Sequence, residues 1–122
     1  MSQGELSTEL ALDRDVYATS ETLTARLTIR NDEPGSPGVL SLSSGQIYDL
    51  DIRDGSGSVV YLWSRGKVFP QVVSELEIED QQEYVLSVPL GKLPRGSYVV
   101  RGWFTSDGPP RAYSASARFQ IE

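Results

Sequence analysis

The sequence predicts an all-β fold, and two features of the chain lead to this prediction. Apolar and polar side chains alternate with period two along most of its length, and no window shows the spacing of an amphipathic helix. Turn-forming Gly, Pro and Asp residues recur about every ten residues between these alternating segments, as in β-sandwiches. We therefore expect an immunoglobulin-like antiparallel two-sheet β-sandwich, formed as a single domain by residues 1–122.

Each expected strand is an alternating segment bounded by turn residues. In residues 22–30 the apolar positions Leu23, Ala25, Leu27 and Ile29 alternate with Thr and Arg, which predicts one dry and one wet face. The same pattern in residues 48–53 predicts that Asp49 and Asp51 face solvent. Residues 13–21 are expected to be a loop. The expected strands are residues 6–12, 22–30, 40–42, 48–53, 58–63, 72–79, 83–90, 97–105 and 112–121.

The connections between these strands can be assigned to the two ends of the sandwich. Residues 54–57 (Asp-Gly-Ser-Gly) supply the positive φ values of a tight hairpin turn. If every connection reverses the chain, residues 44–46 and 63–71 converge at one end, together with residues 13–21 and 91–95. The same count places residues 32–37, 54–57, 80–82 and 106–111 at the other end.

Composition excludes several classes of function. The apolar content of 39% is typical of a soluble globular domain. The formal charge of −6 argues against binding to nucleic acid or to anionic membranes, which both require clustered cations. The absence of Cys suits a reducing compartment, and residues 1–15 do not resemble a secretory signal. We expect a cytoplasmic protein, without a membrane or nucleic-acid partner, that is a monomer.

The residue types present also argue against catalysis and metal binding. The chain has no His, the commonest general base, and its carboxylate pairs Asp49/Asp51 and Glu77/Glu79 belong to strands rather than to a cleft. The spacing Asp49-x-Asp51-x-x-Asp54 superficially resembles a calcium loop. However, Arg53 stands where an EF-hand would need its third acidic residue. We expect a protein that is not an enzyme and holds no cofactor or metal.

One stretch, residues 43–71, carries a more specific pattern. Its informative positions are Ser44-Gly45-Gln46, Tyr48-Asp49, Asp54, Gly57, Trp63-Ser64, Gly66-Lys67, Phe69 and Gln71. With these positions and the strand entry Gly96-Ser97-Tyr98, the chain resembles the BsuPI-type intracellular proteinase inhibitors of bacteria, an all-β family. The resemblance implies a protein inhibitor of an intracellular subtilisin-like serine protease, acting by loop occupation of the substrate cleft without a cofactor.

Two loops could enter a protease cleft, residues 64–71 and the proline-containing residues 106–111, and the first is preferred. Phe69 offers a large apolar side chain for a subtilisin-type pocket, and a peptide bond that precedes proline, here Pro70, is cleaved poorly. Trp63, Tyr98, Trp103 and Phe104 are expected to fill or border the core. The candidate partner contacts are Trp63, Arg65, Lys67, Phe69, Pro70, Gln71 and Gln46.

The residues leave two other functions open. A non-inhibitory β-sandwich interaction module would bind another protein through residues 32–37 and 106–111, much as loops cluster in immunoglobulin domains. Carbohydrate binding would rest on exposed Trp and Tyr rings alone. The inhibitor and the interaction module differ in which end of the sandwich binds.

Overall fold

The fold is all-β, as the computed structural model of the chain shows. The structure describes residues 5–33, 35–36, 38–106 and 113–122, and these contain no helix that could span a membrane. The described residues form ten strands: β1 (Leu6–Leu12), β2 (Val16–Tyr17), β3 (Thr22–Asn31), β4 (Gly38–Leu42), β5 (Tyr48–Arg53), β6 (Val59–Leu62), β7 (Ser74–Ile78), β8 (Gln81–Pro89), β9 (Gly96–Phe104) and β10 (Ser114–Ile121).

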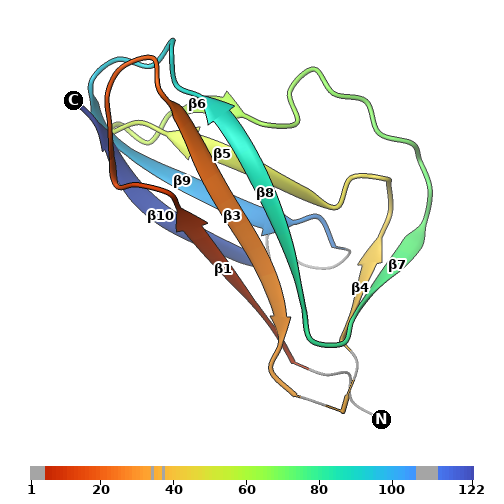
Figure 1. The fold of residues 1–122 in the computed structure, drawn as a ribbon. Helices are drawn as coiled ribbons and strands as arrows, with labels where there is room; N and C mark the ends of the chain where they lie inside the picture. Colours follow the sequence, from red (N-terminus) through yellow and green to blue (C-terminus); the bar gives the residue numbers. More distant parts are fainter. Residues whose placement is uncertain (1–4, 34, 37, 107–112) are drawn as a thin grey trace.

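Two large sheets pack face to face, and a small third sheet lies beside them (Figure 1). The first has the order β1-β3-β8, the second β2-β10-β9-β5-β6, and the third pairs β4 with β7. All of these pairings are antiparallel except that of β2 with β10. The predicted antiparallel two-sheet sandwich is therefore confirmed.

The apolar positions of the alternating pattern form the core between the sheets. From β3, Leu23, Ala25, Leu27 and Ile29 are fully buried, as the alternation predicts. Residues from β5, β9 and β10 pack against them from the second sheet, and burial of each large side chain contributes about 1.5–3 kcal/mol. The Tyr98 hydroxyl donates a hydrogen bond to the Pro94 carbonyl, an arrangement known in immunoglobulin-like sandwiches as a tyrosine corner.

The structure departs from the expected elements at several places; β8, for example, begins at Gln81, inside the connection expected at residues 80–82. Residues 13–21, expected to be a loop, contain β2, which is only two residues long and pairs in parallel with the end of β10. At the start of the expected strand 72–79, Val72 and Val73 lie outside β7 and are exposed. A run of β-branched residues favours a strand, but neither valine has a partner strand in β4, whose pairing with β7 ends at Leu42 and Ser74.

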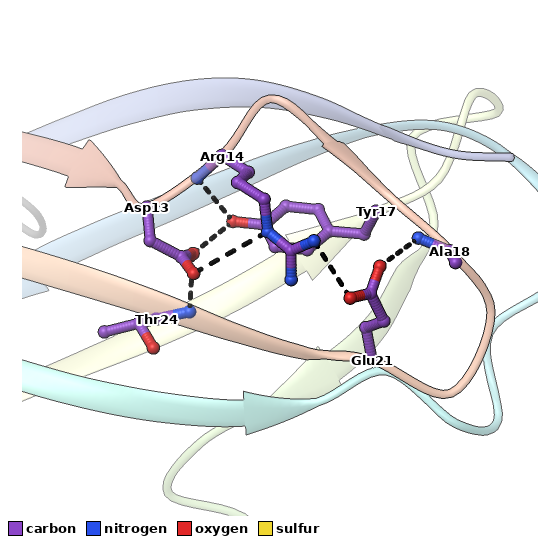
Figure 2. A network of polar contacts seen from close by, with 6 residues as sticks. All are labelled: Asp13, Arg14, Tyr17, Ala18, Glu21 and Thr24. Carbon is purple, nitrogen blue, oxygen red and sulfur yellow. Dashed lines mark hydrogen bonds and ion pairs between the residues drawn. The ribbon is translucent and has the colours of Figure 1, made fainter.

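A polar network closes the end of the sandwich where β1 leads through β2 to β3 (Figure 2). Asp13 Oδ1 accepts hydrogen bonds from the Tyr17 hydroxyl at 2.5 Å and from Thr24 N at 3.0 Å. The Arg14 guanidinium lies over the Tyr17 ring, 4.8 Å from its centroid, and its Nη1 is 2.9 Å from Glu21 Oε2. Because Thr24 belongs to the first sheet and Tyr17 to the second, this network joins the two sheets.

Candidate functional site

The candidate site is the loop of residues 63–73, which connects β6 to β7. It begins with two turns, in which Arg65 N donates to Leu62 O at 3.1 Å and Lys67 N donates to Ser64 O at 3.0 Å. Gly66 adopts a φ of 81°, in the left-handed region that favours glycine. Residues 67–73 then have no regular structure, and Figure 1 shows the connection extending away from the end of β6 before it returns to β7.

The carboxylate of Asp49 holds the start of this loop. Its Oδ1 accepts hydrogen bonds from Leu50 N at 2.8 Å and Ser64 N at 3.1 Å, and its Oδ2 accepts one from the Ser64 hydroxyl at 2.5 Å. The residue is only 6% exposed. A buried carboxylate that accepts three hydrogen bonds orders the groups that donate to it.

The prediction that Asp49 and Asp51 face solvent is therefore wrong. The strand β5 lies inside the five-stranded sheet, between β9 and β6, and its outer face is covered as well as its inner face. Asp49 is beside the buried Trp103 of β9 in the sheet register, and Asp51 is 1% exposed with its Oδ2 3.6 Å from the Arg53 guanidinium. Alternation identified the apolar face correctly, but neighbouring strands decide whether the other face is wet.

A row of aromatic rings leads from the core to the loop. The ring centroids of Tyr84 and Tyr48 are 5.0 Å apart, those of Tyr48 and Trp63 5.0 Å, and those of Trp63 and Phe69 6.0 Å. Trp63 and Phe69 are half-buried, which confirms that Trp63 borders the core. The Lys67 ammonium lies 4.7 Å from the Trp63 ring centroid, a cation–π contact.

A second loop supports the first from the side. Gly45 N donates a hydrogen bond to Pro70 O at 2.7 Å. A Cβ atom at Gly45 would lie 2.8 Å from both Cδ and Cγ of Pro70, so the close approach requires glycine. The predicted convergence of residues 44–46 with residues 63–71 is confirmed.

The assignment of the other connections to the two ends is wrong in part. Ser106 bridges to Leu42, and Thr105 N donates to Ile47 O at 2.9 Å, so this end of β9 lies beside residues 44–46. The turn of residues 54–57 instead lies near Asp15 and Ser97, at the opposite end. The reason is that β4 leaves the large sheets to pair with β7, so the chain turns a corner at residues 43–47. Residues 107–111 lie outside the described residues.

The predicted contact residues divide into two groups. Arg65, Lys67, Pro70 and Gln71 are exposed, whereas Trp63, Phe69 and Gln46 are half-buried. The Gln46 side chain donates to the Tyr48 carbonyl at 3.1 Å, and the Gln46 backbone carbonyl accepts from the Thr105 hydroxyl. Both contacts hold the loop of residues 44–46 in place. The structure brings all seven to the same end of the molecule through the contacts of Gly45, Asp49 and Trp63.

Sequence patterns did not identify the exposed apolar side chains of the loop. Val68 is 95% exposed, Val73 81% and Val72 54%. These are unusual values for valine, which is among the residue types most often buried. A sequence signal existed in the dense apolar run from Val68 to Val73, but such a run equally predicts a strand.

The tyrosines near the loop are neutral at physiological pH. Burial raises the pKa of Tyr84, and burial together with the Asp49 charge raises the pKa of Tyr61, so both hydroxyls stay protonated at neutral pH. Within the part of the chain that the structure describes, no cluster of three or more His, Cys, Asp or Glu side chains could hold a metal ion. The arrangement suits contact with another molecule through an exposed, supported segment.

Comparison with solved structures supports the fold. The sporulation control protein Spo0M from Bacillus subtilis is 11% identical, with a TM-score of 0.68 over 98% of this chain and 50% of its own. The CARDB domain of a Pyrococcus furiosus protein is 11% identical, with a TM-score of 0.54 over 99% of this chain and 96% of its own. The alkylpurine DNA glycosylase AlkC from Pseudomonas fluorescens is 19% identical, with a TM-score of 0.59 over 98% of this chain and 31% of its own.

These likenesses show a shared β-sandwich fold, and the chain spans half the length of Spo0M. No curated protein matches the chain by sequence. The family model described as BsuPI, intracellular proteinase inhibitor, matches residues 10–108. This match includes the loop of residues 63–73 and the elements that support it. The chain belongs to the BsuPI family of intracellular proteinase inhibitors.

Proposed function

We propose that this protein inhibits an intracellular subtilisin-like serine protease by placing residues 67–73 in the substrate cleft. The observation that carries the proposal is the exposure of apolar side chains on a segment outside every strand, with Val68 95% and Val73 81% exposed. The family supports proteinase inhibition in general. The proposal includes a single-domain monomer, in the cytoplasm, that needs no cofactor and catalyses no reaction.

An irregular segment of this kind suits a protease cleft. Its backbone N–H and C=O groups can add a strand to the edge of the protease, which supplies affinity without dependence on every side chain. Pro70 lacks a donor of its own, and its carbonyl already accepts from Gly45 N. A loop held before binding loses less conformational entropy on docking.

The structure favours Val68 over Phe69 as the side chain that enters a protease pocket. Phe69 packs on Trp63 and is half-buried, whereas Val68 contributes nearly all of its surface to solvent. We therefore propose that Val68 makes the main apolar contact and that Phe69 anchors the loop on the aromatic row. Arg65, Lys67, Pro70 and Gln71 are exposed and would contact the rim of the cleft.

The first test is titration of an intracellular subtilisin-like protease, ideally from the producing organism, with the purified protein while peptide hydrolysis is followed. We expect stoichiometric inhibition and an intact inhibitor chain on a gel. Val68→Asp is expected to weaken inhibition about 30-fold or more, the effect of losing a contact worth about 2 kcal/mol. Its unfolding free energy should stay within about 0.5 kcal/mol of the parent, because the site is exposed.

Val85→Asp is the matched control, since Val85 is 57% exposed on β8 and lies outside the loop. It should inhibit like the parent. Phe69→Ala tests the rival assignment, in which Phe69 fills the pocket: a larger loss for Phe69→Ala than for Val68→Asp, with normal folding, would favour that assignment. No inhibition by the parent at large excess, with the chain intact, would reject the proposal and favour a non-inhibitory interaction module.

A further inference from the structure

A concave site lies at the end of the molecule opposite the loop of residues 63–73, on the face of the five-stranded sheet. It is a pocket of about 640 Å³ beside the turn of residues 54–57, and Arg53, Arg101 and Arg118 all line it. We propose that this pocket binds a small organic anion, in which a carboxylate or phosphate group is attached to an apolar group. The inference is independent of protease inhibition, because the pocket shares no residue with the loop of residues 63–73.

The sheet register brings the three arginines together. Val99 of β9 lies opposite Arg53 on β5 and opposite Arg118 on β10, so the two arginines flank it. Arg101 lies two residues further along β9 and therefore on the same face. Opposed residues on neighbouring strands are about 5 Å apart, which places three long cationic side chains around one point of the sheet.

Within the described ranges, two of these arginines form no ion pair. Arg101 and Arg118 form no ion pair within 4 Å with any residue of the described ranges, and Arg53 is shared with the buried Asp51 at 3.6 Å. Among the arginines outside the pocket, Arg26 is 3.1 Å from Glu83, and Arg30 is 2.9 Å from Glu9. Placing three arginines together is unfavourable unless negative charge compensates them. Asp51, which lies opposite Arg101 in the register of β5 and β9 and is 3.6 Å from Arg53, supplies one such charge, and a bound anion would supply more.

The remaining lining residues indicate what else the ligand carries. Val16, which is 42% exposed, and Val99 contribute apolar surface, and a volume of this size is typical of sites for small organic molecules. Asp54 lies in the turn after β5, where its Oδ1 accepts hydrogen bonds from Ser56 and Ser58. Asp15 lies in the segment before β2. Both carboxylates belong to residues that line the pocket, so they limit its net positive charge.

Guanidinium groups are suited to this ligand class. Their planar forks donate paired hydrogen bonds that match carboxylate and phosphate oxygens. Because the lining also carries negative charge, binding depends on these directed bonds more than on long-range attraction. Binding should therefore require an anion that fits between Arg101 and Arg118, and a general increase in ionic strength should not reproduce its effect.

The test is a titration of the ¹⁵N-labelled protein with phenyl phosphate, benzoate and inorganic phosphate, followed by NMR at constant ionic strength. We expect saturable shifts of amides near Val99 and in the turn of residues 54–57. Tighter binding of phenyl phosphate would assign a phosphate ligand, and tighter binding of benzoate a carboxylate ligand. Weaker binding of inorganic phosphate than of phenyl phosphate would support the apolar contact.

The variant Arg101→Gln/Arg118→Gln is expected to lose about tenfold or more in affinity, since each charge-assisted pair is strong. Arg26→Gln/Arg30→Gln changes the net charge equally on the other sheet and should keep the parent affinity. If the double variant does not fold, the single variant Arg118→Gln, at an exposed position, replaces it in the titration. Shifts that do not saturate, or an equal loss in both double variants, would overturn the proposal.

Discussion

Asp49 is the residue that connects the fold to the loop most directly. A single buried carboxylate accepts three hydrogen bonds, and two of them come from Ser64 at the start of the loop. Such a group cannot be replaced by its neutral isostere without loss, because an amide presents a donor where an acceptor is needed. The position of Ser64 thus depends on a charge inside the sheet.

Asp49→Asn is expected to lower the unfolding free energy by about 1–3 kcal/mol, the cost of leaving a buried donor unsatisfied. Urea denaturation measures this change. Inhibition should weaken as well, because the loop loses its anchor at Ser64. Ser64→Ala should have a smaller effect, because it removes only one of the three hydrogen bonds and should lower the unfolding free energy by about 1 kcal/mol. An Asp49→Asn protein with the parent's stability and inhibition would show that the carboxylate does not position the loop.

At the scale of elements, two loops from different parts of the chain form one unit. Residues 44–46 and 63–73 meet through the Gly45–Pro70 hydrogen bond, and the aromatic row attaches this unit to the core. Neither loop has strand pairing of its own at the contact. Their shape therefore depends on a close backbone approach that a side chain at Gly45 would block.

Gly45→Ala is expected to push Pro70 away and to weaken inhibition by about tenfold, corresponding to an overpacking cost of about 1–3 kcal/mol at the contact. The measurement is the inhibition constant, with circular dichroism to confirm the sheet content. Gly55→Ala is the matched control, because a Cβ at Gly55 would meet no atom within 4 Å. Equal inhibition by both variants would mean that the loop tolerates a shift of Pro70.

Sequence patterns predicted most elements well, because strands in a sandwich have one apolar face and alternation records it. The bounds of β1 and β5 agree with the expectation, β3 is one residue longer at its end, and β9 is shifted by one residue at both ends. The pattern could not predict β2, since two residues carry no periodicity and the strand exists only through its pairing with β10. It also could not predict that β4 and β7 form a separate sheet.

For the whole molecule, the network around Tyr17 links global stability to pH. Burial, with the adjacent Asp13 carboxylate, raises the pKa of Tyr17 from 10.0 to about 12. The fold therefore favours the neutral phenol. Its contribution to stability is fully present below pH 10 and is lost as the pH rises through about 12. The hydroxyl donates to Asp13 and accepts from Arg14 N, so ionisation would set two negative charges against each other.

The unfolding free energy of the parent should fall by about 2–3 kcal/mol more than that of Tyr17→Phe between about pH 10 and pH 12. At pH 7 the variant should be less stable by about 1–2 kcal/mol, because Asp13 loses a donor. Chemical denaturation across this pH range measures both effects. The other tyrosines with raised pKa values contribute equally to both proteins, so parallel curves would contradict the role of Tyr17.

The sequence by itself determined the β class, the apolar face of each main strand and, through the residue pattern of positions 43–71, the family. These properties are local, since period-two alternation and short motifs can be recognised without knowing which strands pair. The sequence also determined that Trp63, Phe69 and Gln46 lie at one end. The reason is that β5 and β6 form a hairpin, with Gln46 before β5 and the two aromatic residues after β6. Only the tertiary structure decided that Asp49 is buried, that Val68 is exposed, and that Arg53, Arg101 and Arg118 share one pocket. Those outcomes depend on what covers the second face of a strand, and residues distant in the chain supply that cover.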